Sequence, residues 1–160
     1  MRYEKKELDY SEAKEKALRL LEFRSHSEAD LKNKLVSAGA AEEIADRVLD
    51  FLREYSLVND TTYAQRLASD LSHLKKYGRR RIISELLRRG IDREICEQAA
   101  DQIDTEEYPV LLELMEKKLG GDTSRKSRDR AFRYFAARGY SFDDIRRAFE
   151  KAAQNCITDE

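Results

Sequence analysis

The sequence contains little proline, glycine or cysteine, and no tryptophan. Its 160 residues include one proline and six glycines, whereas average usage of roughly 5% and 7% would give about eight and eleven. Sandwiches and barrels are punctuated by turns rich in these residues, so their scarcity favours helices. The two cysteines, Cys96 and Cys156, have no partners at metal-ligand spacing, which favours reduced thiols over a disulfide framework.

Long apolar runs are also missing, and the formal net charge is only −1. No run approaches the roughly 18 apolar residues of a membrane helix, and the first six residues, MRYEKK, lack the apolar stretch of a secretion signal. We therefore expect a cytoplasmic protein. Because 31 basic and 32 acidic side chains nearly cancel, only the distribution of charge can indicate a partner. The length excludes a large multidomain enzyme.

Apolar residues recur at helical spacing along almost the whole chain, and the pattern restarts twice. This periodicity predicts nine short amphipathic helices in three groups of three. Gly39, Gly90 and Gly139 each follow the middle helix of a group, at separations of 51 and 49 residues. Glycine at such a position supplies the left-handed cap that ends a helix. A repeat of about 50 residues explains these positions.

Helix start signals fit the same three groups. Ser27 with Asp30, and Ser141 with Asp144, have capping-box spacing, and Pro109 suits the first turn of the seventh helix. The sequence predicts an all-α protein of three tandem three-helix repeats. The expected units are residues 11–56, 57–104 and 105–153, with flexible ends at 1–10 and 154–160. Because one unit of this size buries little surface, we expect the repeats to stack into an elongated body.

The residue patterns of catalysis are missing from the sequence. It has no nucleophile with a neighbouring base, no Cys-x-x-Cys, no His-Glu-x-x-His and no phosphate-binding glycine loop. His26 and His73 stand alone, and Gly120–Gly121 is better explained as a linker inside the third repeat. We expect a protein without catalytic residues, metal, cofactor or small-molecule substrate, and we expect a monomer.

Charge is distributed in three blocks. Lys75–Arg93 carries a net charge of +6, Glu94–Glu116 carries −8, and Lys117–Arg138 returns to +6. The two basic blocks correspond in repeat register, since Arg79, Arg81 and Arg89 precede Gly90 as Arg128, Arg130 and Arg138 precede Gly139. The candidate partner-binding residues are Lys75, Lys76, Tyr77, Arg79, Arg81, Arg88, Arg89, Arg125, Lys126, Arg128, Arg130, Arg133 and Arg138.

Two interpretations of these blocks remain open. Arg81 and Arg88 lie opposite the apolar face of their helix, so both could contact a polyanion or an acidic protein surface, with Tyr77 and Tyr134 stacking or packing beside them. Alternatively, Glu85 pairs with both arginines, and the rest is a solvated face without a partner. At helical spacing, Phe132 and Phe135 are better explained as core residues.

Several segments, in this order along the chain, together resemble the RecX family of recombination regulators. They are Arg24–Leu35, Leu57–Ala64, Lys76–Ile82 with Leu86, Gly90–Ile91 and Arg138–Ile145. The resemblance covers roughly residues 11 to 153. Ser56 stands where the family often has glycine, and Asn59 replaces the first of two aspartates.

The resemblance implies a non-enzymatic, all-helical protein that binds the RecA recombinase and its filament on single-stranded DNA. It implies inhibition of filament extension, ATP hydrolysis, strand exchange and co-protease activity, within DNA repair and the SOS response. Weak direct contact with DNA is compatible with the basic blocks. The alternatives are a general single-stranded nucleic-acid-binding helical protein, whose binding would need no recombinase, and a helical scaffold for some other protein.

Overall fold

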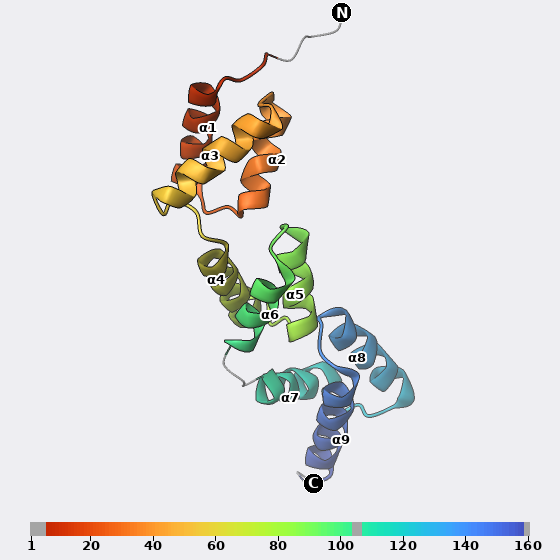
Figure 1. Ribbon diagram of the computed structural model, residues 1–160. Coiled ribbons are helices and arrows are strands. Elements are labelled where there is room, and N and C mark those ends of the chain that lie inside the picture. The colour runs from red at the N-terminus through yellow and green to blue at the C-terminus, as the bar shows by residue number, and fades with distance from the viewer. Residues whose placement is uncertain (1–5, 104–106, 159–160) are drawn as a thin grey trace, which may run out of the picture. The chain divides into compact units, whose positions relative to one another are not determined.

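The computed structural model describes residues 6–103 and 107–158, and these residues form nine α-helices (Figure 1). Their bounds are α1 (Tyr10–Phe23), α2 (Glu28–Ala38), α3 (Glu42–Glu54), α4 (Asp60–His73), α5 (Arg79–Arg88), α6 (Arg93–Asp101), α7 (Glu107–Leu119), α8 (Arg125–Ala137) and α9 (Phe142–Thr158). Within the described ranges, the β-structure is one isolated bridge between Leu8 and Ala40. The predicted all-α class and the three helix trios are confirmed.

The helices begin where the sequence signals predict. The Ser27 hydroxyl accepts the Asp30 N–H at 3.1 Å, and the Ser141 hydroxyl accepts the Asp144 N–H at 3.1 Å. Each bond satisfies a donor that the first turn of a helix leaves without an intrahelical partner. Pro109 lies in the first turn of α7, where its missing N–H costs little.

The three repeat glycines adopt the left-handed conformation that the cap prediction requires. Their φ angles are +116° at Gly39, +74° at Gly90 and +93° at Gly139. A side chain is strained in this region, whereas glycine enters it without cost. Each glycine therefore ends the middle helix of a trio and turns the chain toward the third helix.

The chain divides into two compact units. Unit 1 contains Met1–Arg66 and Leu86–Cys96. Its core lies between α1, α2 and α3, where successive turns of each helix supply fully buried side chains. These include Ala13, Ala17, Leu31, Leu35, Ala45, Val48 and Leu52. Each buried leucine contributes roughly 1.5 to 3 kcal/mol, so this small core is enough to orient three short helices.

Unit 2 contains Leu67–Glu85 and Glu97–Glu160. Its core lies between α7, α8 and α9, with Phe135 entirely buried as predicted and Phe132 partly buried against it. The buried residues of this core are Leu111, Met115, Leu119, Ala131, Phe135, Tyr140, Ile145, Ala148 and Ala152. The N-terminal part of α5 packs on the corner that joins α8 to α9.

The same kind of junction occurs in both units. In unit 1, the Ser27 hydroxyl at the start of α2 donates to the Arg89 carbonyl at 2.7 Å. A Cβ added to Gly90 would lie 2.5 Å from the Ala29 Cβ. In unit 2, the start of α5 contacts the glycine corner after α8. The end of α5 therefore docks on the start of α2, and the end of α8 docks on the start of α5. Both corners require glycine, because a Cβ there would clash with the helix start.

The predicted repeat boundaries and chain ends are only partly described by the structure. Residues 1–5, 104–106 and 159–160, including the predicted boundary at 104 and 105, lie outside the described residues. α1 already begins at Tyr10, after Asp9 has capped it, and α9 continues beyond Gln154 to Thr158. The flexibility of the ends and the elongated body stay predictions. No helix within the described residues is long and apolar enough to cross a membrane.

Candidate partner-binding site

Two loops of unit 2 are held together by their backbones. One loop joins α4 to α5, and the other joins α8 to α9. The Gly78 N–H donates to the Arg138 carbonyl at 2.8 Å, and the Arg80 N–H donates to the Gly139 carbonyl at 3.2 Å. These two donors belong to the start of α5, so the corner after α8 supplies acceptors that the helix itself cannot. The loops therefore form one fixed support.

Two side chains add further bonds between the same loops. The Arg138 guanidinium donates to the Lys75 carbonyl at 2.5 Å, and the Tyr140 hydroxyl donates to the Lys76 carbonyl at 2.8 Å. Lys76 has a φ of +55°, an uncommon conformation for a side-chain-bearing residue. The Tyr140 bond thus fixes a strained residue directly before Tyr77.

Burial determines the chemistry of Tyr140. Its side chain belongs to the core of unit 2, with 3% of its surface exposed. Burial, with a smaller effect of the Glu107 charge, raises the pKa of Tyr140 to about 12. The phenol is therefore protonated throughout the neutral range, as its donation to Lys76 requires.

Cations and aromatic rings alternate on this support, in an arrangement that we call the cationic–aromatic platform. It consists of Tyr77, Arg81, Lys118, Tyr134 and Arg138. Arg81 lies 4.4 Å from the centre of the Tyr77 ring, and Arg138 lies 5.4 Å from Tyr77 and 5.1 Å from Tyr134. Lys118 lies 3.9 Å from Tyr134. These distances are within the range of cation–π attraction, which holds the charged groups in place.

The platform arginines are partly engaged within the fold. An Arg81 Nη1–H donates to the Ala137 carbonyl at 3.0 Å, and its Nε lies 3.7 Å from a Glu85 carboxylate oxygen. Arg81 lies opposite the apolar face of its helix, as expected, but it is only partly exposed because the neighbouring corner covers part of it. Since a guanidinium has five N–H donors, the platform arginines keep donors for an acceptor on a partner.

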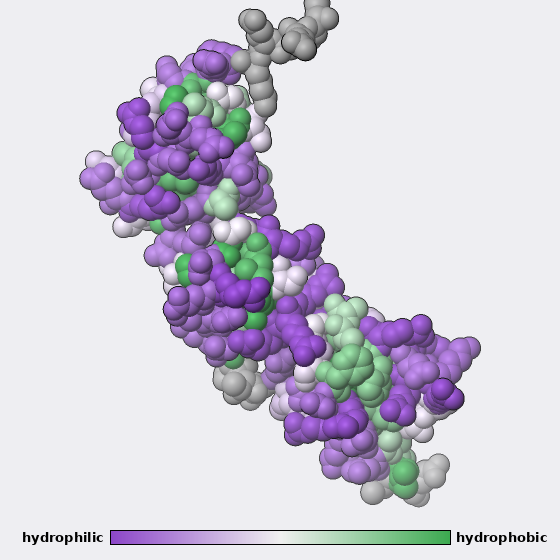
Figure 2. Space-filling view, turned by 45° about the vertical axis from the view of Figure 1, so that its right-hand side comes forward, coloured by the Kyte–Doolittle hydropathy of each residue, from purple (hydrophilic) through white to green (hydrophobic). Residues whose placement is uncertain are grey.

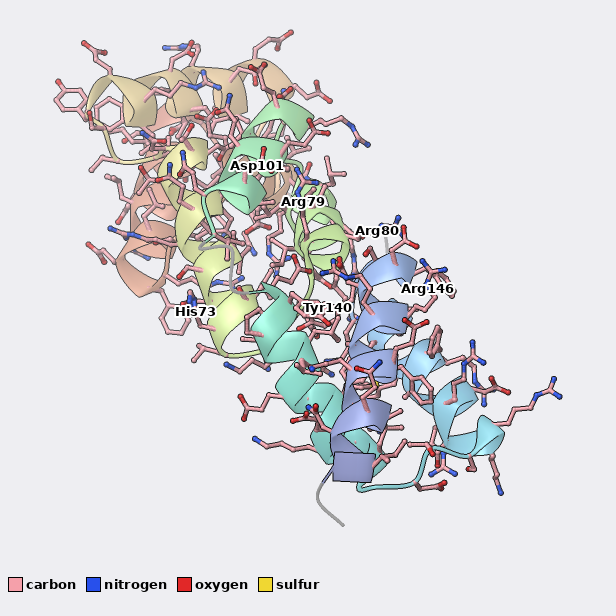
Figure 3. The ribbon with its side chains drawn as sticks, turned by 90° about the horizontal axis from the view of Figure 1, so that it is seen from below. His73, Arg79, Arg80, Asp101, Tyr140 and Arg146 are labelled. Atoms are coloured by element: carbon pink, nitrogen blue, oxygen red, sulfur yellow. The ribbon has the colours of Figure 1, made fainter. Side chains whose placement is uncertain are left out.

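Arg79 takes a different direction from Arg81, although both begin α5. Its side chain lies beside Asp101 (Figure 3), and its guanidinium donates to that carboxylate at 2.6 and 3.1 Å. Its backbone N–H donates to Glu107 at 3.2 Å. Burial raises the pKa of Glu107. With His73 and Tyr140, these residues line a pocket of about 450 Å³. The acidic block thus neutralises Arg79 locally, and the structure does not bring this arginine into the platform.

The cations of α8 lie on two sides of the helix. All five of them, Arg125, Lys126, Arg128, Arg130 and Arg133, are exposed. Arg130 precedes Tyr134 by four residues, the spacing of neighbours on a helix, so it extends the row that leads to Arg138. Arg128 lies on the other side, 5.2 Å from the centre of Phe132 and 5.7 Å from Phe149. It is separate from the platform.

Arg88 and Arg89 belong to unit 1 rather than to the platform's unit. The Arg89 carbonyl accepts the Ser27 hydroxyl, so its backbone has a structural role at the junction of unit 1. Arg88, at the end of α5, is exposed as predicted. Their contribution to partner binding stays a prediction.

Two residues that contribute to the site are not among the candidates predicted from the sequence. Lys118 reaches Tyr134 from α7, and Tyr140 holds the loop between α4 and α5. Lys118 falls inside the second basic block, so the charge map could have included it. Tyr140 gives no such signal, because its partner lies 64 residues away. Among the described residues, no group of three or more histidine, cysteine or acidic side chains could hold a metal ion.

The fold and the platform define a helical protein of tandem three-helix domains with a basic, aromatic surface. Comparison with known families gives a more specific assignment. Residues 13–52, 59–99 and 104–149 match the first, second and third three-helix domains of RecX. The chain belongs to the RecX family.

Individual relatives agree with this assignment. The chain is 33% identical to the regulatory protein RecX of Clostridioides difficile over 146 residues, which cover 89% of this chain and 68% of that protein. It is 34% identical to the regulatory protein RecX of Ectopseudomonas mendocina over 133 residues, 82% of this chain and 88% of the relative.

Solved structures also resemble this protein. The crystal structure of RecX from Lactobacillus salivarius has a TM-score of 0.81 at 22% identity, over 89% of this chain and 96% of that one. A second crystal structure of a regulatory protein RecX has a TM-score of 0.80 at 20% identity, over 88% and 73% of the two chains. At these identities, the likeness concerns the fold.

Proposed function

We propose that this RecX-family protein binds the RecA recombinase and its filament on single-stranded DNA. Binding inhibits filament extension, and with it ATP hydrolysis, strand exchange and co-protease activity, within DNA repair and the SOS response. The protein acts as a monomer in the cytoplasm, without catalysis of its own. Family membership supports the partner, and the cationic–aromatic platform is the observation that supports the contact surface.

The platform suits an acidic partner for a physical reason. Its guanidinium groups are held by rings and backbone carbonyls, so fewer rotamers are lost when an acceptor binds. Arginine forks match carboxylate and phosphate oxygens equally well. The platform therefore contacts acidic recombinase surface or DNA phosphate, and the exposed cations of α8 extend the contact. The acidic block Glu94–Glu116 opposes tight binding to bare DNA.

Regulation requires that the protein prefers one state of the filament. A ligand shifts an equilibrium only by its difference in affinity between the two states. A contact that favours a filament end, or one arrangement of adjacent protomers, therefore slows growth with few bound molecules. A contact with DNA alone acts by covering the strand.

The test is recombinase ATP hydrolysis on single-stranded DNA, measured while this protein is added below the recombinase concentration. We expect inhibition by far fewer molecules than recombinase protomers. No inhibition, or inhibition only at amounts that coat the DNA, contradicts the proposal. The second outcome favours the alternative function, a general single-stranded nucleic-acid-binding protein. Its affinity for bare DNA would fall steeply with salt because binding releases counterions.

A further inference from the structure

The third repeat carries an apolar groove on the side of α8 that faces away from the platform. We call it the aromatic groove: it is lined by Phe132, Ala136 and Phe142, with Arg128, Asp129 and Arg133 at its border. Its volume is about 530 Å³, and 63% of the Phe142 surface is exposed. The lower part of Figure 2, where α8 and α9 lie, shows green hydrophobic surface bordered by purple side chains.

Comparison among the three repeats indicates that the groove is not needed for folding. Three residues after the capping glycine, the first two repeats have Glu42 and Arg93 where the third has Phe142. Three residues before that glycine, they have Val36 and Leu87 where the third has Ala136. The repeat folds with a charged residue three positions after the glycine, so folding alone does not explain the exposed Phe142.

The first repeat shows how this surface is closed elsewhere. Lys32, which corresponds to Phe132, pairs with Asp46 across α2 and α3 at 2.7 Å. In the third repeat, the Phe132 and Phe142 rings lie with their centres 6.3 Å apart and the small Ala136 leaves a notch beside them. An ion pair that water tolerates is thus replaced by apolar surface that gains free energy when a partner covers it.

The geometry points to a protein side chain as the occupant. The planes of Phe132 and Phe142 are inclined at 51°, which makes a notch rather than a flat surface for stacking a nucleobase. Arg128 lies over the Phe132 ring, and the exposed Arg133 borders the groove on the other side. The border therefore carries two cations and one acidic residue, Asp129. This border complements carboxylates in a partner.

We propose that the aromatic groove binds a segment of the recombinase that presents one apolar side chain beside acidic residues. The inference rests on the proposed function, because it takes the recombinase as the partner. It adds a second contact, on the opposite flank of α8 from the platform. The apolar side chain fills the notch over Ala136, and its acidic neighbours meet Arg128 and Arg133. Such an anchor provides specificity for protein that a basic surface alone does not.

Two substitutions test the groove with residues that the repeat already accepts. Ala136→Leu fills the notch with the residue of the second repeat, and Phe142→Arg introduces that repeat's Arg93. Val36→Leu is the matched control for added volume, and Phe23→Arg is the control for loss of an exposed phenylalanine, since Phe23 is 88% exposed on α1. Circular dichroism verifies that all four variants keep the helicity of the parent protein.

The measurement is affinity for recombinase assembled on immobilised single-stranded DNA, with the same DNA alone in a parallel channel. We expect Ala136→Leu and Phe142→Arg to weaken filament binding by about tenfold or more, as for a central anchor. We expect the two controls to remain within about twofold of the parent, and binding to bare DNA to stay unchanged.

Each other outcome overturns the inference and identifies what is wrong. Parent-like filament binding by both groove variants excludes the groove as an interface, while inhibition by the parent protein still supports the proposed function. An equal loss of affinity for bare DNA identifies a nucleobase as the occupant. A parent dimer that Ala136→Leu dissociates, seen by sedimentation, identifies a second copy. A parent protein that does not bind the filament overturns the proposed function itself, and the groove inference with it.

Discussion

The corner at Gly139 allows a quantitative test of how unit 2 is built. Gly139 has a φ of +93°, and a Cβ added there would lie 2.3 Å from the Arg81 backbone nitrogen and 2.5 Å from the Arg81 Cβ. Gly121 has a similar φ of +86°, but no atom lies within 4 Å of an added Cβ. Alanine at either position costs about 1–2 kcal/mol of conformational strain. Only at Gly139 does the clash add about 1–3 kcal/mol.

We therefore expect Gly139→Ala to lower the free energy of unfolding by about 2–5 kcal/mol, and Gly121→Ala by about 1–2 kcal/mol. Urea denaturation of the full chain, followed by circular dichroism at 222 nm, measures both values. Equal losses for the two variants would refute the claim that α5 packs directly on this corner. A larger loss for Gly121→Ala would refute it equally.

Three further predictions concern single groups. Ser56 has a φ of +53°, so Ser56→Gly should raise the free energy of unfolding by about 1 kcal/mol in the same urea assay, and a loss would contradict the strain. Tyr140→Phe removes the bond to Lys76 and should cost about 1 kcal/mol at pH 7. The folded pKa of Tyr140 is about 12, above its ordinary 10.0, so the parent protein's greater free energy of unfolding should decline toward that of Tyr140→Phe as the pH rises from 10 toward 12. A difference between the two proteins that stays constant over this range would contradict the prediction. The Ser127 hydroxyl bond lowers the pKa of Asp122 to about 2, from an ordinary 3.8, so the parent protein's advantage over Asp122→Asn should be complete above about pH 5 and lost as the pH falls through 2. A pH-independent difference in melting temperature would contradict this last assignment.

The local part of the fold was predictable because its signals are local. The cap glycines, Ser27, Ser141 and Pro109 act within a few residues of their own positions, and the structure confirms each. Ser56, which stands where the family often has glycine, has the positive φ that explains the preference.

Asn59 also keeps a local function. Its side-chain oxygen accepts the Thr62 N–H at 3.0 Å, at the start of α4. The aspartate common in the family can make the same bond, because both side chains present an oxygen to the first turn of the helix. The departure from the family pattern therefore leaves the helix start intact.

The arrangement of the basic surface was less predictable. Arg79 and Arg81 are two residues apart and equally basic, yet Arg79 pairs with Asp101 whereas Arg81 lies over Tyr77. Helical periodicity assigns each arginine a direction on its own helix. It cannot place Asp101, which accepts from Arg79 across 22 residues of sequence, or the Ala137 carbonyl, which accepts from Arg81 across 56. Tyr140 shows the same limit, since its hydroxyl acts on a loop that periodicity cannot place beside it.

The most direct test of the account is whether the exposed cations of α8 bind the recombinase filament. Lys126→Glu with Arg130→Glu reverses two exposed charges there, and Lys16→Glu with Arg19→Glu makes the same change in net charge on exposed residues of α1. At one fixed salt concentration, we expect the α8 variant to lose about tenfold or more in affinity for the recombinase filament, and the α1 variant to lose much less. Equal affinities for the two variants would contradict the account, because the basic surface of unit 2 would then serve only as a solvated face.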